Sequence, residues 1–297
     1  MENNFICAKI VILSFGLVVM YPRTNYGEYI NKKNKLYPSY RYDLVLASQL
    51  SSVDYITSSE NGCNPHFQEE VLFIWTFTYW GRGFGVMLGL DSATGCPLYM
   101  SFVKNKTVKD YEDAVSSIVS RGYTIEGIII DEKQSLFKTF SSYHIQMCQF
   151  HMKQIVKRYL TLNPKMLSSR ELKYLVGKLH RSNEDDFVQS YQEWKVKWKN
   201  TINHKSLHKD GKMHYTYQRL RSAMNSLEFY LPYLFTYQRE YCKGMPNTNN
   251  KIEGTFTDLK KNLNNHSGLT MENRKRFISG FFLALAEFLS MKKQELR

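Results

Sequence analysis

The sequence predicts an α/β fold in which an antiparallel meander leads into a helix and then a buried strand. Three runs rich in β-branched and aromatic residues come first, over residues 71–79, 84–90 and 97–104. An amphipathic helix over 110–121 follows, and the apolar run 128–131 then predicts a buried parallel strand ending in an acid. This order is typical of an α/β layer of the ribonuclease-H kind.

Glycine-rich turns separate the three predicted strands and make them antiparallel neighbours. The first turn is Trp80-Gly81-Arg82-Gly83 and the second is Asp91-Ser92-Ala93-Thr94-Gly95. Gly122 ends the amphipathic helix, whose apolar face comprises Tyr111, Ala114, Val115, Ile118 and Val119.

After Asp131 the chain is predicted to be helical over a long distance. Helical periodicity covers residues 147–162, 170–180, 185–203, 214–227 and 270–293. Trp194 and Trp198 stand four residues apart, on one face of a helix. We therefore expect four parts: a poorly defined leader or linker (1–65), the first part of the core (66–145), an all-helical insertion (146–245) and C-terminal helices that complete the core (246–297).

Composition indicates a globular protein, with 43% hydrophobic and 14% aromatic residues in a chain of 297. The five cysteines are scattered and form no Cys-x-x-Cys pair, which argues against a disulfide framework and favours a reducing, cytoplasmic compartment. Residues 5–21 are apolar except for Lys9 and Ser14. They are short for a membrane helix. We expect a buried helix or strand, or a leader unrelated to the fold, with a membrane or export segment as the alternative. Residues 42–50 are compatible with a short helix.

The excess of positive over negative charge lies entirely in residues 131–297. Residues 1–130 contain 11 Lys and Arg against 12 Asp and Glu, whereas residues 131–297 contain 29 against 15. A net charge of −1 in the first part and +14 in the second would draw a polyanion to one region, and nucleic acid is the obvious candidate. Basic solvated helices without any ligand are the alternative.

Two acids stand where a metal site is plausible. Asp131 ends the predicted buried strand, where ligands bind in α/β proteins. Glu253 follows Asn250 at capping-box spacing, which predicts a helix start after Pro246. Clustered carboxylates can hold two Mg²⁺ ions for in-line phosphoryl transfer. The alternative is that each acid only caps a helix.

Cys148 and His151 form a Cys-x-x-His pair on a predicted helix. One such pair is half of a zinc site, and no second pair stands at a usable spacing. We therefore expect no zinc, and a packing or hydrogen-bonding role near the acids.

Five segments together carry a resemblance to a known family. They are Thr78-Tyr79-Trp80-Gly81-Arg82, Ile130-Asp131, Cys148-Gln149-Phe150-His151, Arg219-Leu220-Arg221-Ser222-Ala223 and the run from Pro246 through Asn247-Thr248-Asn249-Asn250 to Glu253-Gly254. They resemble bacterial insertion-sequence transposases of the Mutator-like (MULE-type) DDE class over residues 71–288. The resemblance implies a ribonuclease-H-like catalytic core with an all-helical insertion, and an acidic triad that binds divalent metal and cuts and joins DNA at transposon ends.

The resemblance also implies roles for individual residues. Asp131 matches the second acid of the triad and Glu253 the third, with Mg²⁺ or Mn²⁺ as cofactor. The family's other signature positions are matched by Cys148, His151, Asn247, Asn249 and Asn250, and contacts to DNA are expected from Arg219, Arg221, Lys260 and Lys261. The implied partners are transposon-end and target DNA and further copies of the chain, with a nucleoid-associated location and no small-molecule substrate.

The chain departs from the family pattern in two places. The first acid should precede the Thr-Tyr-Trp-Gly segment by two residues, and Thr76 stands there. If the first hairpin turns near Gly81, Thr76 faces about Met87 and Asp91 lies roughly 13 Å further along, so Asp91 cannot replace the acid. In addition, residues 1–65 show neither the zinc ribbon nor the helix-turn-helix that usually precedes the core. Truncation or a frame change in a degenerate copy would explain both departures.

Three hypotheses follow from these features. The first is a DDE transposase by descent whose activity is impaired because Thr76 replaces an acid. The second is a catalytically dead DNA-binding protein on the same core, and the third is a membrane-tethered protein that uses residues 5–21.

Overall fold

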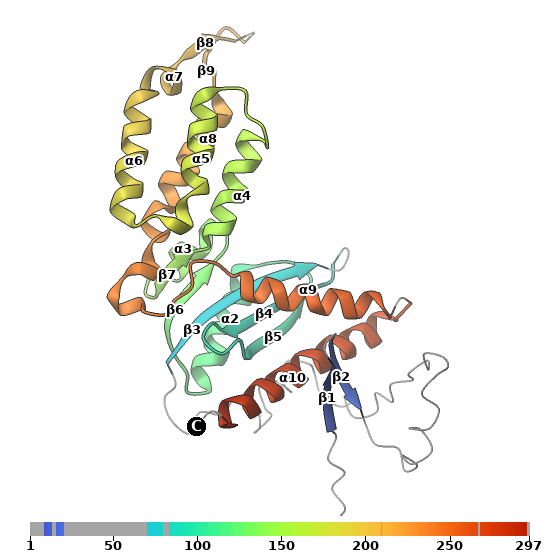
Figure 1. The fold of residues 1–297 in the computed structure, drawn as a ribbon. Helices are drawn as coiled ribbons and strands as arrows, with labels where there is room; N and C mark the ends of the chain where they lie inside the picture. Colours follow the sequence, from blue (N-terminus) through green and yellow to red (C-terminus); the bar gives the residue numbers. More distant parts are fainter. Residues whose placement is uncertain are drawn as a thin grey trace, which may run out of the picture.

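A five-stranded mixed sheet forms the centre of the molecule (Figure 1). The computed structural model describes residues 9–13, 16–20, 70–79, 83–208, 210–266 and 268–295. In the sheet order β5-β4-β3-β6-β7, β4 pairs antiparallel with both neighbours, while β3, β6 and β7 pair in parallel. The protein is therefore a mixed α/β protein, as the sequence predicts. The strands are β3 (Glu70–Tyr79), β4 (Gly85–Asp91), β5 (Pro97–Val103), β6 (Thr124–Ile130) and β7 (His144–Met147).

Strand prediction was accurate for the first three strands and incomplete for the last two. β6 begins at Thr124, four residues before the predicted start, because Ile125 continues the buried pattern while Thr124 is exposed. β7 was not predicted, since its last residue had been assigned to the helix 147–162. That helix, α4 (Gln149–Leu160), begins two residues later than predicted.

Helices cover both faces of the sheet. On one face, α2 (Val108–Ser120) and α3 (Gln134–Thr139) pack in a cluster that includes Phe73, Ile128 and Ile130. On the other face, α9 (Asn250–Asn264) and α10 (Met271–Glu295) pack in a cluster that includes Ile74 and Ile129. The apolar face of α9 has the spacing of a helix, with buried residues at Ile252, Phe256, Leu259 and Leu263.

Residues 149–242 form a helical lobe that projects from the sheet (Figure 1). The predicted helix 185–203 is interrupted at Trp198, and the predicted helix 214–227 begins later because residues 213–215 form a strand of a short hairpin. The segment is therefore mostly, and not entirely, helical. Besides α4 it contains α5 (Leu167–Gly177), η3 (Leu179–Arg181), α6 (Glu184–Lys197), α7 (Lys199–Asn203), β8 (Lys205–Leu207), β9 (Met213–Tyr215), α8 (Gln218–Tyr230), η4 (Leu231–Tyr233), η5 (Thr236–Gln238) and η6 (Glu240–Cys242).

Trp194 and Trp198 both join helices of the lobe through their indole N–H groups. Trp194 Nε1 donates to the carbonyl oxygen of Ser168 at 3.0 Å, and Trp198 Nε1 donates to Glu171 Oε2 at 2.7 Å. Both acceptors belong to α5, so the two tryptophans do lie on one side of the α6–α7 segment.

A seam of three hydrogen bonds joins residues 234–237 to β7, and a fourth joins them to Gln149 at the start of α4. The side-chain amides of Gln146 and Gln149 both donate to the carbonyl oxygen of Leu234, at 3.0 and 2.9 Å. The backbone N–H of Tyr237 donates to Gln146 Oε1 at 3.0 Å, and the hydroxyl of Thr236 donates to the carbonyl oxygen of Ile145 at 2.6 Å. Because Gln146 and Gln149 are fully buried, their polar groups need these partners.

The apolar N-terminal stretch contains two strands. β1 (Lys9–Leu13) and β2 (Gly16–Met20) pair antiparallel, from Lys9 opposite Met20 to Leu13 opposite Gly16. Among the residues that the structure describes, no helix has the length and apolar character needed to cross a bilayer. The short helix considered for residues 42–50 lies outside the described residues.

Candidate functional site at the carboxyl edge of the sheet

The carboxyl ends of the parallel strands meet at one edge of the sheet, and two predicted site residues lie there. Ile74 of β3 stands opposite Ile129 of β6. Two residues further along these strands are Thr76 and Asp131, so the parallel register places their backbones level with each other on strands about 4.8 Å apart. On the other side, Thr76 pairs with Leu88 and not with Met87, a shift of one residue from our prediction.

Asp131 is buried, and its carboxylate is bonded within the protein. One oxygen forms an ion pair with Lys106 Nζ, and the other accepts the backbone N–H of Lys133 at 3.2 Å. Lys133 Nζ donates to the carbonyl oxygen of Lys106 at 2.6 Å, and both ammonium groups lie within 6 Å of the centre of the Tyr111 ring. A positive charge supplied by the chain itself therefore already compensates the Asp131 carboxylate.

The two lysines influence each other. Burial, and then the positive charge of Lys106, lower the pKa of Lys133, while the negative charge of Asp131 opposes this shift. Lys106 pairs with the Asp131 carboxylate, whereas the Lys133 ammonium bonds to the carbonyl oxygen of Lys106 and also feels the negative charge of Asp110.

Hydrogen bonds join the Cys-x-x-His segment to the Asn-rich segment across 101 residues of sequence. The Cys148 thiol donates to Asn249 Oδ1 at 3.0 Å, and the Gln149 N–H donates to the carbonyl oxygen of Asn247 at 2.9 Å. The backbone N–H of Cys148 in turn donates to the carbonyl oxygen of Ile130 at 2.9 Å, immediately before Asp131. Two segments that carry the family resemblance therefore lie beside the third.

Glu253 lies in the first turn of α9, which starts at the position predicted from the sequence. Its N–H donates to the carbonyl oxygen of Asn249 at 3.2 Å, so it stands one helical turn beyond the residue that contacts Cys148. The Lys251 ammonium anchors this turn by donating to the carbonyl oxygens of Ser92 and Ala93, at 2.8 and 2.9 Å. The start of α9 is therefore held on one side to Cys148 and on the other to the turn between β4 and β5.

The predicted capping box at Asn250 and Glu253 is wrong. The residue at the N-cap is Asn249, and its side chain makes no capping hydrogen bond. The reason is that its side-chain oxygen accepts the thiol of Cys148. Asn249 is buried, and its role is to connect two segments of the core.

Cys148 precedes α4 and does not lie on it, which corrects the prediction that both motif residues share a helical face. Burial is the main cause that raises the pKa of the Cys148 thiol, so the sulfur remains protonated and acts as a donor. His151 lies one turn into α4, and its Nδ1 atom is buried without a hydrogen-bond partner among the described residues. These properties agree with the hydrogen-bonding role expected for the thiol and leave the imidazole without an assigned partner.

The residues at this edge do not fit a two-metal centre. Asp131 is paired with Lys106. Asp91 stands opposite Phe73, away from this edge, and accepts the backbone N–H groups of Ala93 and Thr94 within its own turn, at 3.1 and 3.0 Å. Within the described part of the chain, no group of three or more His, Cys, Asp or Glu side chains is arranged to hold a metal ion. With a neutral threonine at position 76, the negative charge that two divalent ions require is missing.

The predicted DNA contacts are distributed over two regions, neither of them next to Asp131. Arg219 begins α8 and lies about 16 Å along the helix from Tyr230, whose hydroxyl reaches the carbonyl oxygen of Glu132. Arg221 is held by Ile202 O, Asn203 Oδ1 and the ring of Tyr215. Lys260 and Lys261 are exposed on α9, where Lys261 is 3.8 Å from Asp258.

Lys106 and Lys133 were not predicted as site residues. Lys106 belongs to the loop after β5, which ends at the same edge as β3 and β6, so the rule that ligands bind at the carboxyl ends of strands would have included it. Comparison with known proteins adds no identification, because no family profile and no curated protein matches the chain.

Proposed function

We propose that the chain is a DNA transposase of the DDE class by descent, impaired in catalysis, on a ribonuclease-H-like core into which the helical lobe is inserted. The observation that carries this proposal is the contact of Cys148 with Asn249 beside Ile130. It brings together the two most specific segments of the resemblance at the strand end that bears Asp131. A helix start bearing Glu253 follows directly, which is the arrangement that the resemblance implies.

The chemistry implied by the resemblance is in-line attack on a phosphodiester, first by water and then by a DNA 3′-hydroxyl. The residues of this chain meet its requirements only in part. Asp131 lies at the edge and Glu253 in the first turn of α9, but Thr76 supplies no charge and Lys106 neutralises Asp131. We therefore expect the copy to cleave DNA poorly.

The test is nicking of supercoiled plasmid, and cleavage of the DNA ends that flank the gene, in the presence of Mg²⁺ or Mn²⁺. Thr76→Asp restores an acid at the first triad position and is expected to raise the cleavage rate by at least about tenfold, because a metal ligand is gained. The matched control is Thr76→Asn, which has nearly the same size as aspartate and carries no charge. If the unmodified chain cleaves as fast as Thr76→Asp, the impairment is disproved; if neither cleaves, the transposase proposal loses its support.

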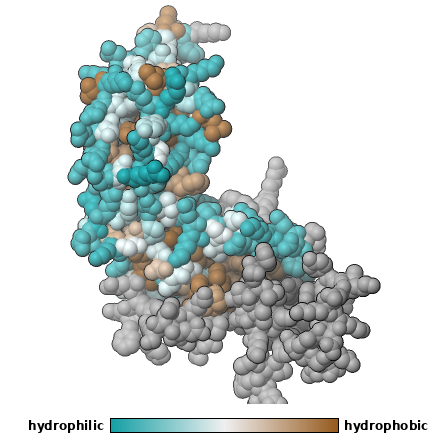
Figure 2. Space-filling model, in the orientation of Figure 1, coloured by the Kyte–Doolittle hydropathy of each residue, from teal (hydrophilic) through white to brown (hydrophobic). Residues whose placement is uncertain are grey.

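A DNA-binding protein without catalysis is the second candidate, favoured by the Lys106–Asp131 ion pair together with the charge of the helical lobe. Residues 149–242 contain 17 Lys and Arg against 8 Asp and Glu. Figure 2 shows hydrophilic residues over most of the visible face of the lobe. Such a surface can bind phosphates without reading sequence.

Salt dependence and metal titration separate the two candidates. DNA binding that weakens steeply with salt and is unchanged by Mn²⁺, in a protein that takes up no Mn²⁺ by itself, supports the binding protein. Binding or cleavage that saturates with Mn²⁺ supports the enzyme. A membrane-tethered protein is tested by fractionation, where recovery in the membrane pellet after a salt wash would support it.

A further inference from the structure

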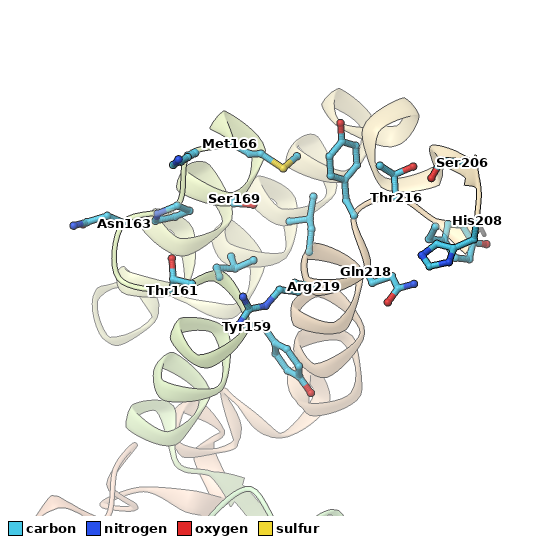
Figure 3. A pocket seen from close by; sticks show the side chains of 16 residues that line it. Tyr159, Thr161, Asn163, Met166, Ser169, Ser206, His208, Thr216, Gln218 and Arg219 are labelled. Carbon is cyan, nitrogen blue, oxygen red and sulfur yellow. The ribbon is translucent and has the colours of Figure 1, made fainter. Parts of the chain in front are cut away.

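A cavity of about 640 Å³ lies in the helical lobe, at the end remote from the sheet (Figure 3). One wall comes from the end of α4 and the connection to α5, including Tyr159 and Lys165. The other wall comes from the β8–β9 hairpin and the start of α8, including His208, Tyr217 and Arg219. The volume falls within the range of about 300–1,000 Å³ that is usual for small-molecule sites.

The hairpin wall is fixed by contacts that do not use the cavity. Thr216 N donates to the carbonyl oxygen of His204 at 2.9 Å, and the Thr216 hydroxyl lies 2.7 Å from His204 Nδ1. The guanidinium carbon of Arg221 is 3.6 Å from the centre of the Tyr215 ring, and Arg221 donates to the carbonyl oxygen of Ile202 at 3.1 Å. Arg221 therefore holds the hairpin in place, whereas Arg219 lines the cavity.

The opposite wall contains a strained backbone position. Thr161 lines the cavity and has a φ of 70°, and among the described residues it is the one non-glycine residue with a positive φ. A β-branched residue in this region carries strain, and such strain is found preferentially at functional sites. This backbone conformation of Thr161 ends α4 and turns the chain into the loop that carries Lys165.

The charge of the cavity selects an anion. Lys165, His208 and Arg219 line it, and its lining includes no Asp or Glu. The acid in the hairpin turn, Asp210, is occupied by His214 Nε2 at 2.9 Å and by the N–H of Lys212 at 3.0 Å. Arg219 Nη2 has one neutral partner, the carbonyl oxygen of Arg158 at 3.3 Å. A guanidinium in this setting suits bidentate binding of a phosphate.

The aromatic residues of the cavity favour an anion that also carries an aromatic ring. Tyr159, Tyr215 and Tyr217 are half-buried in its walls. Tyrosine rings next to a phosphate-binding cation are the combination on which nucleic-acid bases stack. Because Arg221 already packs on the Tyr215 ring, the rings available to a base are those of Tyr159 and Tyr217.

We propose that this cavity binds one nucleotide, its phosphate at Arg219 and Lys165 and its base against the tyrosines. The nucleotide is either free or one unit of a DNA strand, since both present the same chemistry. The free-nucleotide form goes beyond the proposed function and does not depend on it, because it needs neither DNA nor a metal. The strand-unit form deepens the DNA binding proposed above and rests on it.

The test is calorimetric titration of the full chain with dAMP, and separately with a twelve-residue oligodeoxyadenylate. We expect Arg219→Ala to weaken binding by about tenfold or more, since a charge-assisted pair is lost. Arg181→Ala is the matched control, because it removes one exposed arginine from the other end of the lobe and should leave affinity unchanged. Lys165→Ala, on an exposed loop, is a second variant in case Arg219→Ala does not fold.

The two titrations distinguish a free nucleotide from a nucleotide within a DNA strand. Binding of dAMP that depends on Arg219 or Lys165 assigns a free nucleotide, and such dependence for the oligonucleotide alone assigns a strand unit. Equal affinity of all variants for both ligands overturns the proposal, and so does competition by inorganic phosphate at the concentration at which dAMP competes, because the base then contributes nothing. A chain that cleaves DNA normally but shows no Arg219-dependent nucleotide binding disproves this site alone.

Discussion

The carboxyl edge of the sheet and the far end of the helical lobe both gather polar residues from separate segments, but they use them differently. At the edge, polar groups bond to one another, as Asp131 does to Lys106 and Cys148 to Asn249. At the far end of the lobe, Lys165 and Arg219 line an open cavity. Polar residues that satisfy each other hold a structure in place, whereas those around a cavity remain available to a ligand.

The difference also concerns motifs. The edge is built from the segments that resemble a transposase, and its acids are the residues that a motif search selects. The cavity belongs to no motif except for Arg219. The polar residues of the edge are bonded to one another, whereas those that line the cavity of the lobe are open to a ligand.

The largest effect is expected from a change in the packing under α9. Phe256→Ala removes a fully buried ring that lies 6.0 Å from that of Phe282, and should lower the free energy of unfolding by about 3–5 kcal/mol. Urea denaturation followed by circular dichroism measures this. Val196→Ala, on an exposed position of α6, is the control and should change stability by less than about 0.5 kcal/mol. Equal losses in the two variants would show that the α9 face is not a tightly packed core.

A smaller loss is expected at the seam between the lobe and the sheet. Gln146→Met leaves the N–H of Tyr237 without its acceptor and should cost about 1–3 kcal/mol, because a buried donor loses its hydrogen bond. Gln189→Met, on the exposed side of α6, is the matched control. Limited proteolysis should in addition cut Gln146→Met faster between η4 and η6. A variant as stable and as resistant as the control would mean that the lobe is not held through Gln146.

A pH-dependent effect is expected inside the lobe. Burial, followed by the negative charge of Glu228, raises the pKa of Tyr191 above its usual value of 10.0. Burial and Glu132 likewise raise the pKa of Tyr230 to about 12. The folded state holds these protons more tightly than the unfolded state does. The stability they contribute is therefore fully present below pH 10.0 and is lost as the pH rises through the folded pKa values.

Tyr191→Phe removes one of these groups and should lose less stability than the unmodified chain between about pH 8 and about pH 11. Tyr174→Phe, at an exposed position of α5, should behave as the unmodified chain does. Urea denaturation at the two pH values gives the comparison. Identical pH dependence of all three proteins would contradict a role for Tyr191 in alkaline unfolding.

The smallest effect is expected at the hairpin tip. Leu207 and Met213 face each other across β8 and β9, and both are exposed. Leu207→Ala should change the free energy of unfolding by less than about 0.5 kcal/mol and leave nucleotide affinity unchanged, because Leu207 does not line the cavity. A loss above about 1.5 kcal/mol, seen by urea denaturation, would show that the hairpin packs more closely than its exposure indicates.

Periodicity was sufficient to predict most of the sheet. The β-branched and aromatic run in β3 and the apolar run ending at Ile130 leave little choice of element, and the glycine-rich turns after β3 and β4 set the antiparallel order. β7 escaped because Gln146 interrupts its apolar pattern, and that residue is needed for the seam with Leu234. β8 and β9 escaped because three residues each are too few to establish an alternation.

The site residues could be predicted only where the sequence places a single acid at the end of a predicted strand or at the start of a predicted helix. Asp131 and Glu253 stand at a strand end and at a helix start, positions that the sequence marks. The Asn249 side chain could be expected to cap α9, but its thiol partner comes from 101 residues away and no local rule includes it. The cavity is assembled from two connections of the lobe, so its residues become neighbours only when α4 and α8 pack together.

The seam at β7 has a mechanical consequence. Ile145, Gln146 and Gln149 form hydrogen bonds with Leu234, Thr236 and Tyr237 at the C-terminal end of the lobe. These bonds oppose a hinge motion where the lobe leaves the sheet. A force applied by a ligand at the far end of the lobe would therefore be transmitted to the sheet.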